Sequence, residues 1–416
     1  MNWLSTAPVL MVGLFFLGAL VGGQINRGIY RLAWYPRAIG PWSKPHEEAP
    51  ARRWFDRIPI LGWLGLSREA GIHGRGYWIR PLLIELAVGI GYAALYWYEI
   101  QQVGVYTVPG VIIVAPGAAT LKAQLIAHLV LISLMIVATF IDFDEQTIPD
   151  SITVPGALAG LLFAAALPWS LPLVTTSVPP FSWETLTIAS PAPWPDWLDG
   201  TGGLVLGLLC FWGACFAVVP WTWTTRRGWS KACVFLVASI RRHPVSGRIG
   251  VLAVVGTIAI AGVWSMGHPW WKGLFTSLVG MAFGGGLIWA VRIIGRQALG
   301  QEAMGFGDVT LMSMIGAFTG WQATLVIFFL APVAALFISV TQWILTRRRD
   351  IAFGPYLCLA TLFLLLRWGS LWHHSVGRSF AMGWVIPAMV VCGLALMWAL
   401  LTILRFLRMA VTGAAE

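Results

Sequence analysis

Charged residues are scarce in this chain. Only 11% of its 416 residues are Asp, Glu, Lys or Arg, whereas 58% are hydrophobic. A soluble globular domain has about 25% charged residues. The shortage therefore excludes a soluble enzyme, a disordered chain and a nucleic-acid-binding module, and it predicts an integral membrane protein.

Cysteine is scarce as well. The five Cys residues stand apart at positions 210, 215, 233, 358 and 392, in or beside apolar segments. They lack the paired spacing of a zinc site and the density of a small disulfide-linked fold. The chain also has no repeat of solenoid or propeller period and no glycine-rich nucleotide-binding fingerprint.

Long apolar runs make up most of the chain. A membrane-spanning helix needs roughly 17–25 mostly apolar residues. Such runs lie near residues 8–22, 82–100, 121–141, 152–172, 202–222, 250–266, 271–294, 323–345, 355–367 and 382–404. A shorter apolar stretch, 309–318, is expected to enter the membrane only partway. The sequence thus predicts an all-α polytopic bundle of about 9–11 membrane segments, whose first run is a permanent helix rather than a cleaved signal peptide.

Basic residues indicate how the bundle is oriented. The net charge is +10, and the cytoplasmic loops of membrane proteins carry an excess of Lys and Arg. Residues 25–81 hold ten basic residues and residues 226–248 hold six. Placing both stretches in the cytoplasm puts the N-terminus outside and the C-terminus in the cytoplasm, provided that 309–318 and 323–345 form an outward and return pair.

Two acidic residues lie at the ends of apolar runs. Asp142 stands in the segment FIDFDEQTIPD and Asp308 ends the segment MGFGD. Ionisable groups at such depths are costly and are functional candidates by default. Under the predicted orientation both lie at the cytoplasmic edge, where two carboxylates that share one proton suit aspartic peptidolysis: the ionised acid takes a proton from water, and the protonated acid polarises the scissile carbonyl.

The neighbours of these acids have separate expected roles. Gly305 and Gly307 would let a substrate strand approach closely. Asp144 diverges from Asp142 by roughly 200° on a helix, so only one of them can face a common site. Asp150 follows Pro149 at a predicted helix start, where a carboxylate interacts favourably with the helix dipole. A single Asp at a membrane boundary is often a solvated end cap, so the functional signal lies in the pair.

At this point the sequence resembles the type IV prepilin peptidases, which are polytopic aspartyl proteases with a GxGD motif. The match covers most of the chain, with six landmarks in family order: GALVGGQINRGIYR from Gly18, IPILGWLGL from Ile58, RPLLIEL from Arg80, FIDFDEQTIPD, GFGD and FGP from Phe353. In the RPLLIEL segment Pro81 is displaced by one place from the family pattern.

The resemblance implies an enzyme that cleaves the short basic leader from prepilins or pseudopilins, at the cytoplasmic face of the inner membrane and without a cofactor for proteolysis. It implies that Asp142 and Asp308 are the catalytic aspartates and that Gly305 and Gly307 shape the site. Glu85 matches a frequent family glutamate. Two roles stay open for it: shaping the active site or binding substrate, or pairing with Arg80 near the membrane surface.

The first cytoplasmic loop departs from the family. Many members carry two Cys-x-x-Cys pairs there, with the spacing of a structural zinc site, whereas residues 25–81 contain no Cys and only His46 and His73. Both histidines are expected to be solvated, and zinc is predicted to be absent. Bifunctional members also N-methylate the new N-terminus with S-adenosylmethionine. The missing cysteines leave methylation open, and S-adenosylmethionine is required only if methylation is retained.

These patterns divide the chain into four regions. Residues 173–270 look like an insertion between the two Asp segments, and its two extra spans would keep both aspartates on one face. Residues 1–100 hold the first two spans and the counterpart of the methyltransferase-associated loop, and residues 101–172 hold the spans flanking Asp142. Residues 173–270 hold two spans, the basic loop 226–248 and a Pro- and Trp-rich outer loop at 173–200, which is either poorly ordered or caps the outer surface. Residues 271–416 hold the spans around Asp308 and the last helices.

Two alternatives come from other functional classes. One is a polytopic transporter with a proton-coupled carboxylate pair, which would place its acids near the membrane midplane and often has internal repeats. The other is an inactive relative that binds pilin precursors in an assembly complex. The edge position of both acids and the lack of a repeat argue against the first, and the intact Asp142 and Asp308 argue against the second.

Overall fold

The computed structural model of this chain describes residues 3–111, 113–176, 181–220, 242–300, 304–346 and 352–412, with four further residues between 234 and 239. Within them the fold is helical apart from one two-stranded ribbon. The long elements are α1 (Trp3–Leu32), α4 (Ile79–Tyr96), α5 (Ala118–Glu145), α6 (Asp150–Ala166), α7 (Thr201–Val218), α9 (Pro244–Met266), α10 (Trp270–Leu299), α11 (Phe306–Thr346), α12 (Gly354–Leu371) and α14 (Val385–Thr412). The short helices are α2 (Leu61–Leu66), α3 (Ala70–His73) and α13 (Gly377–Phe380), and the strands are β1 (Leu173–Thr175) and β2 (Trp183–Thr185).

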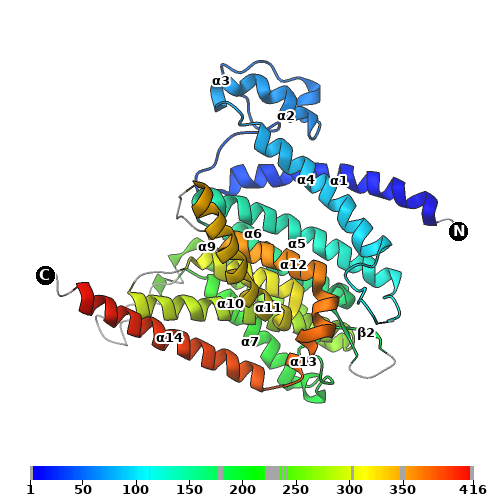
Figure 1. Cartoon of the computed structure of the whole chain (residues 1–416), viewed down its shortest axis with the longest axis vertical. Helices are drawn as coiled ribbons and strands as arrows, with labels where there is room; N and C mark the ends of the chain where they lie inside the picture. The colour runs from blue at the N-terminus through cyan, green and yellow to red at the C-terminus, as the bar shows by residue number, and fades with distance from the viewer. Residues whose placement is uncertain are drawn as a thin grey trace.

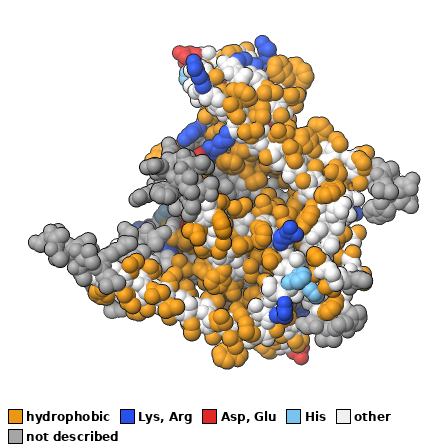
Figure 2. Space-filling view, viewed as in Figure 1, with side chains coloured by type: hydrophobic (Ala, Val, Ile, Leu, Met, Phe, Trp, Pro, Cys, Tyr) orange, Lys and Arg blue, Asp and Glu red, His pale blue; other side chains and the backbone are white. Residues whose placement is uncertain are grey.

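The predicted membrane architecture is confirmed. Nine of the described helices are long and apolar enough to cross a membrane, and α6 is a shorter apolar helix of 17 residues. The chain is therefore an all-α polytopic membrane protein. Side chains on the visible face of the bundle are mostly hydrophobic, as a lipid-facing surface requires (Figure 2).

The helices form a buried centre and an outer layer. Helices α5, α6, α10, α11 and α12 lie in the middle of the molecule, α1 and α4 lie on one side of them, and α14 runs along the opposite edge (Figure 1). Of the apolar window in α10, 61% is buried inside the protein, whereas only 6% is buried in α9 and in α14. The outer helices therefore present most of their surface to lipid.

Helix α11 is a hairpin of two arms. Gly320 interrupts it with φ 76° and ψ 168°, a conformation that glycine adopts without strain. A Cβ atom placed on Gly284 of α10 would lie 2.5 Å from the carbonyl oxygen of Met312 and 3.1 Å from a methyl group of Thr324. Residues on both sides of Gly320 thus meet the same point of α10, which means that the chain reverses there. The arms correspond to the predicted outward and return pair, 309–318 and 323–345.

One expectation for the middle of the chain needs correction, and one open alternative is decided. The run 152–172 does not continue as one helix, because α6 ends at Ala166 ahead of Pro168, and the residue before a proline is driven out of helical conformation. Of the two alternatives for 173–200, the described part is the ordered one: β1 pairs with β2, and Leu186 and Leu198 are buried. Most of the predicted basic loop 226–248 lies outside the described residues.

Candidate active site

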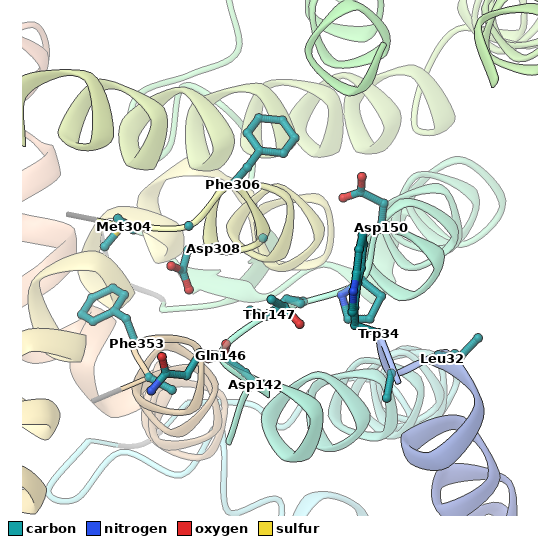
Figure 3. Close-up of a pocket in the computed structure, with 16 residues that line it drawn as sticks. Leu32, Trp34, Asp142, Gln146, Thr147, Asp150, Met304, Phe306, Asp308 and Phe353 are labelled. Atoms are coloured by element: carbon teal, nitrogen blue, oxygen red, sulfur yellow. The ribbon is translucent and has the colours of Figure 1, made fainter. Parts of the chain in front are cut away.

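Asp142 and Asp308 line one cavity of about 600 Å³. Asp142 comes from the last turn of α5 and Asp308 from the first turn of α11, and the two carboxyl groups enter the same hollow (Figure 3). They lie close enough for the charge of Asp142 to act on Asp308. Both side chains are largely buried, with 5% and 8% of their residue surfaces exposed. Residues 166 positions apart in sequence therefore converge.

The start of α12 positions Asp142. The backbone N–H of Gly354 donates a hydrogen bond to Asp142 Oδ2 over 3.1 Å. A Cβ atom on Gly354 would lie 2.5 Å from the same oxygen, so only glycine allows α12 to approach so closely. The N-terminus of a helix also carries partial positive charge, which favours a nearby carboxylate.

The turn before α11 positions Asp308. The backbone of Gly305 hydrogen-bonds to the Asp308 carboxylate. Arg292 of α10 holds this turn, because its Nε donates to the Met304 carbonyl over 3.1 Å and its guanidinium lies 5.8 Å from the Phe306 ring centre. Gly307 packs against Ile148: a Cβ atom placed on Gly307 would lie only 2.8 Å from the Cβ atom of Ile148. Gly307 thus lies at a point of close backbone approach, whereas a Cβ atom on Gly305 would meet Asp308 Oδ2 at an ordinary contact distance of 3.8 Å.

Asp144 points away from the cavity, as its helical spacing from Asp142 predicts. Its carboxylate pairs with Arg80 over 2.8 Å, and the Arg80 guanidinium stacks on Phe140. The suggested pairing of Arg80 with Glu85 is therefore wrong, because the end of α5 supplies a nearer carboxylate to Arg80.

Glu85 does not line the cavity; it joins α4 to the first loop. The carboxylate is 2% exposed and accepts hydrogen bonds from the backbone N–H of Ile60 over 2.5 Å and from the Trp63 indole over 2.7 Å. Asn26 of α1 donates to it over 3.3 Å. Ile60 has φ 66°, which is strained for a β-branched residue, so the Glu85 bond holds an otherwise unfavourable turn.

Two ion pairs hold the first loop together. Arg52 pairs with Glu69 over 3.1 Å, and Arg68 pairs with Asp56. Burial raises the pKa of Asp56, but the hydrogen bonds from Arg68 and from the backbone N–H of Arg53 outweigh this effect and hold the pKa below its usual value. The loop therefore has a compact fold that depends on charge pairs between side chains.

The loop histidines differ from each other. His46 is exposed, as predicted, whereas the ring of His73 contacts that of Tyr77 at a tilted angle and its Nε2 lies 3.7 Å from a Glu69 carboxylate oxygen. Among the residues that the structure describes, no group of three or more His, Cys, Asp or Glu side chains could hold a metal ion.

The sequence does not indicate the roles of Trp34 and Asp150, which line the cavity, or of Gly354, which contacts Asp142. Gly354 belongs to a recognised landmark, but nothing in the sequence gave it a partner. Trp34 lines the cavity beyond the end of α1, and Glu145 accepts its backbone N–H over 2.6 Å. Asp150 lines the cavity as well as starting α6. These roles depend on tertiary contacts that no local motif indicates.

The arrangement provides what acid–base hydrolysis of a peptide needs. Two neighbouring carboxylates can hold one proton and one water between them. The cavity lies within the size range of ligand sites, about 300–1,000 Å³.

Comparison with known proteins gives results that agree with this geometry. A model of the type IV leader peptidase family matches residues 129–241 and 240–340, which together make up more than half of the chain and include Asp142 and Asp308. A prepilin leader peptidase/N-methyltransferase of Myxococcus xanthus (strain DK1622) is 25% identical over 375 residues, covering 86% of this chain and 90% of that protein. Proteins of the same name from Pseudomonas aeruginosa and Aeromonas hydrophila are 36% and 33% identical, over 26% and 22% of this chain and 38% and 30% of their own lengths. No solved structure matches the chain.

Proposed function

The chain belongs to the type IV leader peptidase family, and from this premise we propose that it is a membrane aspartic endopeptidase that removes the leader peptide of prepilins or pseudopilins. Asp142 and Asp308 are its catalytic pair. The observation that carries the proposal is the convergence of these two carboxylates, from α5 and α11, in one cavity.

The reaction uses water as the nucleophile. The ionised carboxylate removes a proton from a water held between the two acids, and the oxygen attacks the scissile carbonyl carbon. The protonated carboxyl group donates its proton to the carbonyl oxygen, which gives a neutral tetrahedral intermediate. As the C–N bond of that intermediate breaks, one carboxyl group donates a proton to the leaving amine and the other carboxylate takes a proton from a hydroxyl of the intermediate, so the pair ends as it began, with one proton shared. The titration belongs to the pair, so neither residue is assigned a fixed acid or base role.

In this proposal the active site lies at the cytoplasmic face of the inner membrane. The basic residues of 25–81 place the first loop on that side by the positive-inside rule. Helix α1 begins and α14 ends on opposite sides of the bundle (Figure 1), which fits an outer N-terminus and a cytoplasmic C-terminus. Trp34, at the start of the first loop, donates its backbone N–H to Glu145, which follows Asp142 at the end of α5. Asp142, and Asp308 in the same cavity, therefore lie at the end of the bundle that carries the first loop.

N-methylation is a second activity that the names of the relatives include. The first loop keeps a compact fold in this chain, but it does so through the Arg52–Glu69 and Arg68–Asp56 pairs. It lacks the cysteines associated with the bifunctional members. We propose no zinc in this loop, and S-adenosylmethionine serves as a cofactor only if methylation is retained.

Co-expression of the full chain with a type IV prepilin tests the peptidase assignment. Asp142→Asn and Asp308→Asn are each expected to abolish leader removal, whereas Asp144→Asn is expected to retain it. Asp144 is a matched control, because it loses the same charge from the same turn but faces Arg80 outside the cavity. Cleavage that persists in both cavity variants would contradict the assignment and would favour a transporter or a binding protein. Mass measurement of the mature pilin in the same samples shows whether its N-terminus is methylated.

A further inference from the structure

The active-site cavity is acidic in a basic protein. The net charge of the chain is +10, yet the described residues that line the cavity include three aspartates and no Lys or Arg. Two of these acids, Asp142 and Asp308, are assigned to catalysis. The third, Asp150, has no part in the proposed reaction.

Asp150 is available to a substrate. It stands in the first turn of α6, its residue surface is exposed, and it contacts the hydroxyl of Thr310. No described Lys or Arg forms an ion pair with it. The residue therefore belongs to the cavity wall, and no described Lys or Arg neutralises its carboxylate.

An exposed indole lies on the same wall. Trp34 is 77% exposed and lines the cavity. Trp34 and Asp150 are on one side of the hollow, while Met304 and Phe353 are on the other (Figure 3). A carboxylate beside an aromatic ring is suited to an ammonium or guanidinium group, because the carboxylate pairs with the charge and the ring face attracts it.

Glu145 fixes the position of this indole. One carboxylate oxygen accepts the backbone N–H of Trp34 over 2.6 Å and the other accepts that of Tyr35 over 3.2 Å. Glu145 stands three residues after Asp142 on the same helix, α5. The wall formed by Trp34 is therefore tied to the helix that carries one of the proposed catalytic acids.

We propose that Trp34 and Asp150 form a subsite that binds a Lys or Arg side chain of the leader peptide, and that Glu145 is the positioning residue for Trp34. The inference rests on the proposed function, and it assigns the recognition of substrate charge to the cavity. The basic first loop is unsuited to that task, because like charges repel.

Asp150 and Trp34 each have a structural role to weigh against the subsite, and a measurement that varies the charge of the substrate separates the two. Asp150 also stabilises the start of α6 through the helix dipole, and it can position Gly307 through Thr310, whose hydroxyl donates to the Gly307 carbonyl over 3.1 Å. Trp34 could act as an interfacial anchor. Neither role depends on the charge of the substrate, whereas a cation subsite does.

The test is a double-mutant cycle between enzyme and substrate. The full-length enzyme in detergent micelles is assayed with a prepilin and with variants in which each leader Lys or Arg is changed singly to Gln. Asp150→Asn is expected to raise KM for the native prepilin about tenfold with little change in kcat, which is the size expected of a charge-assisted contact. One Gln substitution in the leader should cause the same loss with the wild-type enzyme and no further loss with Asp150→Asn.

Conservative variants separate recognition from folding. Asp150→Glu and Trp34→Phe are expected to keep most of the preference for the basic leader, whereas Trp34→Ala should lose it. Glu145→Ala should raise KM in the same way, with partial rescue in Glu145→Gln, which retains one acceptor oxygen. Each variant is compared after size-exclusion chromatography, so that a misfolded variant is recognised before kinetics are measured.

The outcomes separate this inference from the peptidase assignment. If the Asp150→Asn loss falls on kcat, or is equal for basic and neutralised leaders at every position, Asp150 acts on the fold and the subsite is overturned. The peptidase assignment would then still stand, because it depends on the Asn variants of Asp142 and Asp308. If those variants retain cleavage, the proposed function fails regardless of the result at Asp150.

Discussion

Gly354 donates its backbone N–H to Asp142, and the two residues are so close that a methyl group on Gly354 would lie 2.5 Å from the carboxylate oxygen. The contact joins the end of α5 to the start of α12. Since the hydrogen bond and the absent side chain act at the same point, the position of Asp142 depends on a glycine that is itself no part of the chemistry.

Gly354→Ala is therefore expected to displace Asp142 and to lower kcat by about 100-fold, the size of effect that a misplacement of about 1 Å can have. Gly286→Ala is the control, because Gly286 lies within α10 and a Cβ atom there meets nothing within 4 Å. Cleavage rates measured with a purified prepilin check both variants. Full activity in Gly354→Ala would show that the contact is not needed.

The dependence of activity on pH tests the shared proton. One carboxyl group must be ionised and the other protonated, so kcat/KM is expected to follow a bell-shaped profile whose two limbs belong to the Asp142–Asp308 pair. The measurement uses the full chain in detergent with a prepilin whose own ionisable leader residues are held constant. A rate that rises to a plateau at alkaline pH would contradict this mechanism.

The Glu85 contact predicts a local effect on stability. Glu85→Ala removes the acceptor of the Ile60 and Trp63 hydrogen bonds, so the first loop is expected to lose about 1–3 kcal/mol of stability. Limited proteolysis of the full chain should then cut between residues 34 and 78 at a higher rate. Glu48→Ala, an exposed position in the same loop, should leave the cutting rate unchanged. Equal rates in both variants would show that Glu85 does not anchor the loop.

The Asp56–Arg68 pair predicts how the loop responds to acid. The pKa of Asp56 is lower in the folded loop than in an unfolded chain. The ionised Asp56 therefore contributes its full stabilisation of the folded loop above the usual pKa of about 4, and this contribution is lost as the pH falls through the lowered pKa. Asp56→Asn should reproduce that loss at neutral pH, as measured by proteolysis of the loop.

Metal analysis completes the loop experiment. Chelators should leave the cutting rate of the wild-type loop unchanged, and mass spectrometry of the purified chain should find no stoichiometric zinc. A zinc ion at one per chain would overturn the prediction of a metal-free loop.

Much of the fold and the centre of the site could be predicted from the sequence. Long apolar runs mark spanning helices directly, because the bilayer fixes their length. Asp142 and Asp308 could be paired because they stand out as acids at the ends of such runs, and because the positive-inside rule places both on one side. The outward and return pair of 309–318 and 323–345 also followed, since the basic residues before and after it had to lie on the same side of the membrane, but the glycine at which the chain turns was not predicted.

The partners of individual side chains could not be predicted in the same way. Arg80 and Glu85 are near in sequence on α4, but Arg80 pairs with Asp144 of the neighbouring helix α5. Glu85 instead accepts a hydrogen bond from Ile60 in the first loop, whose sequence has no helical or strand periodicity. The contact of Glu145 with Trp34 spans 111 residues and uses backbone N–H groups, which every residue type offers. Such contacts follow from the tertiary packing, so local sequence does not identify them.

The first arm of α11 has one more consequence. Its side chains from Val309 to Phe318 are almost entirely covered by protein, with Leu311, Met312, Met314, Ile315 and Ala317 each 0% exposed. Changes in bilayer thickness act on helices that touch lipid, such as α9 and α14, by tilting them. The first arm, which carries Asp308, is shielded from that force, so the depth of its carboxylate is set by the protein itself, and the same pair of acids can keep its spacing in membranes of different lipid composition.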